Sequence, residues 1–153
     1  MKGMATAATI AVVAVLTAGV AQAQQRAVPT PEQFFCRDLQ RIVRAAPDFV
    51  AMYKAKGAPP SLGFRPGACQ AFTADATNPA TYACHQNLAP AHLTLDSLAA
   101  MTAACLPDAT RLPAEYRREA VFEVRGLRIR INEHGTARGK VGRFIGFRVE
   151  ARP

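Results

Sequence analysis

The stretch that decides the fold reads AVFEVRGLRIRIN and occupies residues 120–132. It is rich in β-branched and aromatic residues with charges between them, which is typical of a strand buried on one side. The alternation changes phase part-way: Phe122 and Val124 share one parity, and Leu127, Ile129 and Ile131 share the other. Because Gly126 lies at this change of phase, we expect a bulge or a bend within one long strand.

A further strand is predicted over residues 141–150, joined to the first by a loop through residues 132–139. Alternate residues of a strand share a face, so the arginines of this hairpin project together into solvent. Guanidinium groups placed in this way can bind phosphate or carboxylate groups in bidentate fashion. The candidate residues for binding an anion or a partner are Arg128, Arg130, Arg138, Lys140 and Arg148.

Two shorter strands are predicted earlier in the chain, over residues 68–73 and 80–86, with a turn between them. A symmetric hairpin over these segments places Cys69 opposite Cys84. Both cysteines then face inward, and His85 faces outward.

Two helices are predicted, over residues 31–45 and 95–105. The first begins with a capping box, in which Thr30 precedes the helix and Gln33 lies three residues later. Thr94 is the expected N-cap of the second helix.

The predicted order of elements is therefore α-β-β-α-β-β. We expect an α+β domain in which two helices pack on one face of a mostly antiparallel four-stranded sheet, stapled by disulfides. Residues 48–53 are expected to form a short turn, and residues 54–67 and 107–116 are expected to form loops.

Four cysteines occur in the chain: Cys36, Cys69, Cys84 and Cys105. An even number in an exported chain predicts two disulfides, and the absence of a C-x-x-C motif argues against a redox pair or a zinc ribbon. The preferred pairing joins helix to strand, as Cys36 with Cys69 and Cys84 with Cys105. The alternative pairs Cys69 with Cys84 across the hairpin and Cys36 with Cys105 between the helices.

The N-terminal segment predicts export. Residues 1–23 carry Lys2, then an apolar run, and end in the A-x-A pattern of a signal-peptidase site. This apolar run is shorter than the span of a bilayer, so we expect cleavage rather than a transmembrane anchor. Residues 24–29 then form a flexible leader and residues 30–153 a single domain, located in the bacterial periplasm or secreted.

The net charge is +8, and removal of residues 1–23, which contain Lys2, leaves +7. The excess is concentrated in residues 111–153, which hold 11 basic and 5 acidic side chains. A basic surface attracts polyanions. Outside the cytosol the expected partners are an acidic envelope polymer or an acidic protein, not nucleic acid. The simpler interpretation is that the charge only keeps the domain soluble.

Catalytic and metal-binding patterns give little support for an enzyme. The histidines His85, His92 and His134 have no metal-motif spacing, and neither Ser61 nor Ser97 has a base nearby in the sequence. No metal or cofactor is expected. The leading hypothesis is a small exported binding module that contacts an anionic envelope component through the basic C-terminal hairpin. The alternatives are a periplasmic hydrolase that uses Glu133 or His134, and an enzyme inhibitor; the oligomeric state is left open.

Overall fold

The computed structural model describes residues 28–54, 57, 59–87, 89–135 and 142–152. The three helices are α1 (Pro31–Ala45), α2 (Val50–Lys54) and α3 (Leu95–Cys105). The six strands are β1 (Cys69–Phe72), β2 (Thr81–Gln86), β3 (Thr110–Leu112), β4 (Glu119–Val124), β5 (Leu127–His134) and β6 (Phe144–Ala151).

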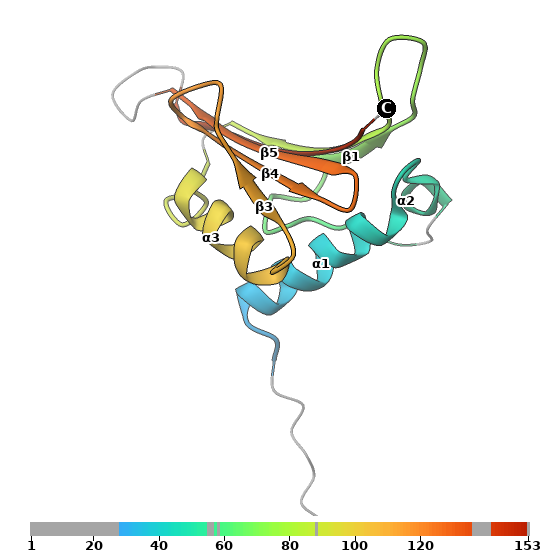
Figure 1. The fold of residues 1–153 in the computed structure, drawn as a ribbon. Helices are drawn as coiled ribbons and strands as arrows, with labels where there is room; N and C mark the ends of the chain where they lie inside the picture. The colour runs from blue at the N-terminus through green and yellow to red at the C-terminus, as the bar shows by residue number, and fades with distance from the viewer. Residues whose placement is uncertain (1–27, 55–56, 58, 88, 136–141, 153) are drawn as a thin grey trace, which may run out of the picture.

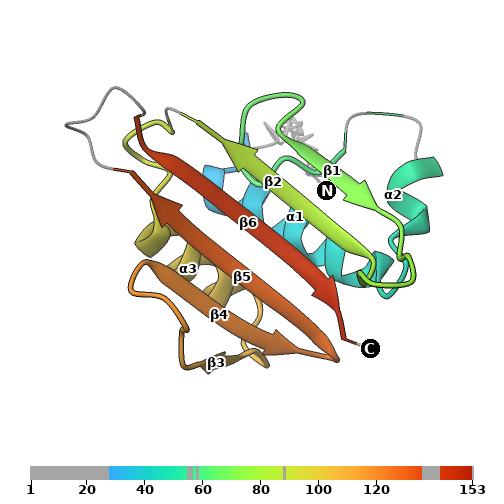
Figure 2. The same cartoon turned by 90° about the horizontal axis from the view of Figure 1, so that it is seen from above.

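The strands form one antiparallel sheet in the order β1-β2-β6-β5-β4-β3. The helices lie on one face of this sheet, and the other face is open, as Figures 1 and 2 show. The predicted four-stranded sheet with two helices is therefore wrong. The described part of the sheet has six strands, where four were predicted. In addition, the short helix α2 follows α1 where a turn was expected.

The first missing strand arises from the change of phase near Gly126. Residues 120–132 are not one bent strand, because a two-residue turn separates β4 from β5. Arg125 and Gly126 both have positive φ, at 50° and 74°. Positive φ at both central residues is the feature of a type I′ hairpin turn. The turn reverses the chain, so both parities can face the same core.

The second missing strand, β3, lies within the segment predicted as a loop. It is only three residues long and pairs with β4 at the edge of the sheet, where Arg111 lies opposite Phe122. Such a short edge strand takes its conformation from its neighbour, and its own residues carry no alternating pattern that could have predicted it.

The register of the β1–β2 hairpin confirms the prediction: Cys69 lies opposite Cys84. Both cysteines are buried and His85 is exposed. The turn between the strands is held by Asp75, whose carboxylate accepts hydrogen bonds from the backbone nitrogens of Thr77 and Asn78, both at 2.8 Å.

The two main helices begin where predicted, and each has a complete capping box. Thr30 accepts from the backbone of Gln33 in α1, and Thr94 accepts from the backbone of Ser97 in α3. These bonds satisfy backbone donors that would otherwise be unpaired at a helix start. Capping fixes the ends of the helices, and packing against the sheet fixes their position.

The disulfides join Cys36 to Cys105 and Cys69 to Cys84. The preferred helix-to-strand pairing is therefore wrong, and the alternative is right. The physical reason is the register: Cys69 and Cys84 face each other directly in the ladder, with Cα atoms 4.0 Å apart. The remaining cysteines meet where α1 and α3 pack together.

The core fills the space between the helices and the sheet. Phe35 of α1 packs edge-on against Phe147 of β6, with ring centroids 5.9 Å apart. Tyr82 is fully buried and donates its hydroxyl hydrogen bond to the carbonyl of Pro60. Among the described residues, no helix is long and apolar enough to cross a lipid bilayer. With the helix-facing side of the sheet occupied by the core, the open face is where the sheet itself can meet another molecule.

Candidate functional site

Side chains on the open face form rows across the strands. In one row Glu123, Arg128 and Glu150 are neighbours, and in the next Arg130 and Arg148 lie opposite each other. Such cross-strand neighbours are close enough to interact directly. The predicted exposed arginines thus come together on one face, and the glutamates of β4 and β6 lie among them.

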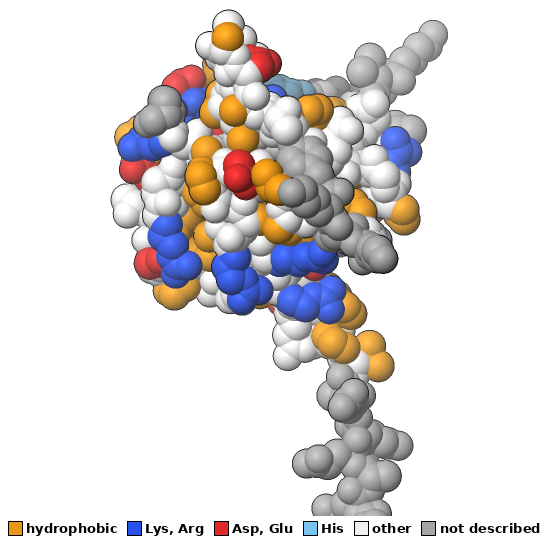
Figure 3. All heavy atoms as spheres, turned by 90° about the vertical axis from the view of Figure 1, so that its right-hand side faces the viewer, with side chains coloured by type: hydrophobic (Ala, Val, Ile, Leu, Met, Phe, Trp, Pro, Cys, Tyr) orange, Lys and Arg blue, Asp and Glu red, His pale blue; other side chains and the backbone are white. Residues whose placement is uncertain are grey.

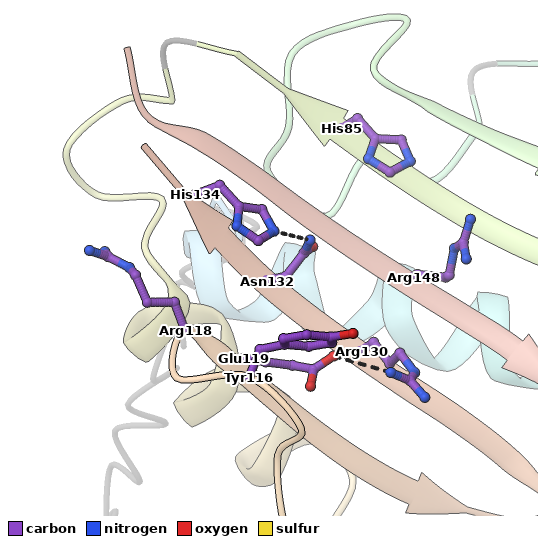
Figure 4. A pocket seen from close by; sticks show the side chains of 8 residues that line it. All are labelled: His85, Tyr116, Arg118, Glu119, Arg130, Asn132, His134 and Arg148. Atoms are coloured by element: carbon purple, nitrogen blue, oxygen red, sulfur yellow. Dashed lines mark hydrogen bonds and ion pairs between the residues drawn. The ribbon is translucent and has the colours of Figure 1, made fainter. Parts of the chain in front are cut away.

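A hollow of about 440 Å³ opens on this face beside those rows, and Figure 4 shows it from close by. We call it the sheet hollow. It is lined by His85, Tyr116, Arg118, Glu119, Arg130, Asn132, His134 and Arg148. Strands β2, β4, β5 and β6 and the segment before β4 all contribute, so the hollow exists only in the assembled sheet.

Arg130 is the most strongly paired of these arginines. Its guanidinium lies 3.3 Å from Glu119, 3.6 Å from Glu115 and 4.0 Å from Glu150. Burial opposes its charged form, but the three carboxylates, led by Glu119, outweigh that effect and raise the pKa of Arg130 above its ordinary value. Arg130 is therefore a fixed part of a charge network.

Arg148 is more available. Half of its side chain is exposed, and it contacts Glu150 at 3.0 Å. It also affects His85: partial burial, and secondly the charge of Arg148, lower the pKa of His85 below its ordinary value. At neutral pH His85 is therefore an uncharged hydrogen-bonding group next to a cationic one.

An aromatic side chain lies next to two of the histidines that line the hollow. Phe144 lies between two imidazoles, with its ring centroid 5.8 Å from that of His85 and 6.1 Å from that of His134. The amide nitrogen of Asn132 lies 3.0 Å from Nε2 of His134, a contact drawn in Figure 4. A Cβ atom at Gly146 would collide with Oδ1 of Asn132, so the glycine makes room for this amide.

Glu133 and His134, proposed as an acid–base pair, do not meet. His134 lies on the open face, whereas Glu133 is buried on the helix side. The Glu133 carboxylate contacts Arg118 at 2.6 Å and accepts a hydrogen bond from the backbone nitrogen of Leu95 at 2.9 Å. It also lies 3.6 Å from Arg143. Glu133 therefore holds the start of α3 and the segment before β4 to β5.

The remaining predicted site residues are placed differently. Arg128 lies between Glu123 and Glu150 in its row, and its Nε atom is buried without a hydrogen-bond partner among the described residues. Arg138 and Lys140 lie outside the described residues. Within the described ranges, no group of three or more His, Cys, Asp or Glu side chains could hold a metal ion.

Sequence reasoning found the arginines but missed most of the hollow's wall. Tyr116 comes from the segment predicted as a loop, and Arg118 follows that segment and was assigned to no element. Asn132 was placed at the boundary between the predicted strand and loop, and His134 within the loop, although both lie within β5. Extending the alternation of Ile129 and Ile131 by two residues would have placed Asn132 and His134 on the strand.

Comparison of the chain with protein-family models, with curated proteins and with solved structures finds no significant match. What the protein does is therefore argued from its own geometry.

Proposed function

We propose that the protein is a small exported binding module that recognises an anionic envelope component or an acidic protein through the open face of its sheet. The disulfides, the predicted signal peptide and the basic charge of the C-terminal region support this proposal. The partner presents carboxylates, as acidic polysaccharides and acidic polypeptides do.

The observation that carries the proposal is the position of Arg148 at the sheet hollow. Its side chain is 50% exposed, so a partner can reach its guanidinium without breaking into the core. His85 stands beside it as a neutral donor or acceptor, and Phe144 offers an apolar surface. These groups suit a carboxylate carried on an aliphatic or sugar backbone. The carboxylate would pair with Arg148, and the backbone of the ligand would pack against Phe144.

The same geometry limits the strength of binding. Arg130 is paired with carboxylates of the protein itself. It therefore contributes to the electrostatic potential of the hollow more than to direct contact with a partner. Exposed ion pairs contribute about 1 kcal/mol or less and weaken as salt increases. We therefore expect binding to a polymer with many carboxylates to be weak for each group and sensitive to salt.

The test is binding of the oxidised protein to poly-L-glutamate and to a polyuronate, with neutral dextran as the reference polymer, followed by calorimetry at two salt concentrations. Arg148→Gln should lower the affinity about three- to fivefold, the effect of one exposed ion pair. The matched control is Arg125→Asn, which removes an equal charge from the β4–β5 turn, where Arg125 contacts only Asp108 among the described carboxylates. Equal losses in the two variants, or no difference between charged and neutral polymers, would refute the proposal.

Acid–base catalysis is the second candidate, because His134 and Glu119 both line the sheet hollow. In this reading a hydrolase would use His134 as the base, since Glu133 is turned away. A screen of ester and phosphoester hydrolysis, with His134→Gln as the comparison variant, decides between a hydrolase and a binding module. Turnover that disappears in this variant supports catalysis, and turnover that persists in it, or no turnover at all, refutes it.

A further inference from the structure

A second group of arginines lies away from the sheet hollow, beside the helix layer. Arg37 and Arg41 are four residues apart on α1, so they project from the same side of the helix. Arg65 belongs to the loop of residues 59–67 that runs past this side. Together these three line a hollow of about 350 Å³, which we call the arginine hollow.

Charge distinguishes this hollow from the open sheet face. Within the described part of the chain, neither Arg41 nor Arg65 forms an ion pair. Asp38 also lines the hollow and lies 3.4 Å from Arg37. Three arginines and a single carboxylate thus line this hollow. Figure 3 shows basic side chains gathered along the lower part of one side of the molecule, at the level of the helices.

The Asp38 carboxylate already has its own partners in the fold. It is buried, and its Oδ2 accepts hydrogen bonds from the backbone nitrogens of Ser61 at 2.9 Å and Leu62 at 3.3 Å. These hydrogen bonds hold the loop against α1. The negative charge of Asp38 is therefore already satisfied by backbone donors of the loop. The positive charge of Arg41 and Arg65 is left for something outside the chain.

The loop also holds Arg65 in place before any ligand arrives. The backbone nitrogen of Arg65 donates to Oε1 of Gln86 at 3.0 Å, and its carbonyl accepts from Ala68 at 3.1 Å. The neighbouring side chain of Phe64 is buried in the core. Because the backbone is already ordered, binding loses less conformational entropy than it would on a free loop.

We propose that the arginine hollow binds a tetrahedral oxyanion, a phosphate or sulfate group either free or as an ester. A guanidinium is a planar fork that pairs with two oxygens at once. One carboxylate occupies one such fork, whereas a tetrahedral group has enough oxygens to accept from three arginines. This site is separate from the sheet hollow and does not depend on the function proposed for it.

The test uses three probes on the oxidised full-length protein: inorganic phosphate, glycerol 3-phosphate, and vesicles of phosphatidic acid compared with vesicles of phosphatidylcholine. Acetate is the carboxylate reference. We expect saturable binding of at least one phosphate probe, seen by calorimetry and by shifts of the backbone amides of residues 61–65 and 67. The probe that binds most tightly identifies the source of the phosphate.

Substitutions then locate the site. Arg41→Gln and Arg65→Gln should each weaken binding about tenfold or more, the effect of a lost charged hydrogen bond. The matched control is Arg44→Gln, which removes the same charge from the last turn of α1 but does not line the hollow. We expect it to change affinity less than about twofold, because an exposed charge is screened.

Protection from modification by phenylglyoxal provides a measurement that needs no variant. Bound phosphate should slow the modification of Arg41 and Arg65 but not that of Arg44. The absence of saturable binding by every phosphate probe would overturn the proposal. So would equal losses in Arg44→Gln and Arg65→Gln, since they would indicate diffuse attraction to charge.

Discussion

Arg130 and Arg148 lie directly opposite each other on β5 and β6. Like charges at such a position destabilise a sheet. Glu150 lies within reach of both, 3.0 Å from Arg148 and 4.0 Å from Arg130, and offsets their repulsion. This carboxylate therefore occupies a place that an anionic partner would otherwise take.

Removing the Glu150 charge should have two opposite effects. In Glu150→Gln we expect the affinity for poly-L-glutamate to rise about threefold, because Arg148 loses its competing carboxylate. The free energy of unfolding should fall by about 1 kcal/mol, because Glu150 no longer offsets the repulsion between the two arginines and only Arg130 keeps other carboxylate partners, Glu115 and Glu119. Calorimetry and urea denaturation measure the two effects. Glu123→Gln is the control, since it removes an equal charge from the same face and Glu123 forms its ion pair with Arg152, not with Arg130 or Arg148. An affinity that falls in Glu150→Gln would contradict this account.

The buried carboxylate of Glu133 has a structural role, and Glu133→Gln should show it. The substitution removes the charge that faces Arg118 and Arg143 while keeping an oxygen for the backbone of Leu95. We expect a loss of about 2 kcal/mol in the free energy of unfolding, typical of a buried charged group that loses its partner. Urea denaturation at pH 7 measures it. An unchanged midpoint would show that the ion pairs add nothing to stability.

The disulfide pairing can be tested by peptide mapping without reduction. Trypsin is unsuitable because no Lys or Arg lies between Cys69 and Cys105, so chymotrypsin, which cuts after Phe72 and Tyr82, is used. We expect a fragment that joins Cys69 to Cys84. A fragment that joins Cys36 to Cys69 would overturn the observed pairing.

Loss of each disulfide should lower stability according to the loop it closes. By the loop-entropy model, replacing both Cys69 and Cys84 by Ala should lower stability by about 3 kcal/mol, and replacing both Cys36 and Cys105 by about 4 kcal/mol. The order follows from sequence separations of 15 and 69 residues. Thermal unfolding of the two double variants tests it, and the reverse order would show that strain or residual structure dominates.

Gly126 is required by the turn between β4 and β5. Gly126→Val should destabilise the protein by about 1–2 kcal/mol, because a β-branched residue is strained at a φ of 74°. No atom lies within 4 Å of the position where its Cβ would be, so the loss comes from the backbone alone. Gly126→Asn is the control and should lose less, since asparagine tolerates this conformation. Equal losses would point to another cause.

The turn at Asp75 predicts a pH dependence. Hydrogen bonds to the carboxylate, first from the backbone of Thr77 and then from the side chain of Asn78, lower the pKa of Asp75 to about 2. Since the folded pKa lies below the unfolded one, these bonds stabilise the turn fully above the ordinary pKa and are lost as the pH falls through about 2. Titration of the carboxyl carbon by NMR measures the midpoint. A midpoint near 3.8 would show that the bonds do not form.

Local patterns predicted the parts of the fold that local chemistry determines. The capping residues Thr30 and Thr94 located both main helices, and simple pairing arithmetic placed Cys69 opposite Cys84. The change of phase at Gly126 could indicate either a bulge or a two-residue turn. Both insert an odd shift into the alternation of inward and outward residues, so the sequence pattern does not distinguish them. Arg-Gly is also not among the usual Asn-Gly or Asp-Gly pairs of such turns.

The site was harder to predict because it depends on strand order. Alternation placed Arg130 and Arg148 on an exposed face, as observed. It could not show that β6 lies between β2 and β5, which brings His85 next to Arg148 and sets Phe144 between two histidines. The arginine hollow was missed for a similar reason, since Arg65 reaches α1 only through the bonds between the loop and Asp38.

The position of β6 in the sheet has a consequence for how the chain acquires its shape. This strand is made after all the others, yet it bridges the β1–β2 hairpin and the β3–β4–β5 group. Until it emerges from the ribosome, the two halves have no common partner and each keeps an unsatisfied edge. The pairing of β2 with β6 joins residues that are far apart in sequence, and contacts of this kind make for slow closure. The six-stranded sheet can therefore be completed only once its last strand, β6, has been made.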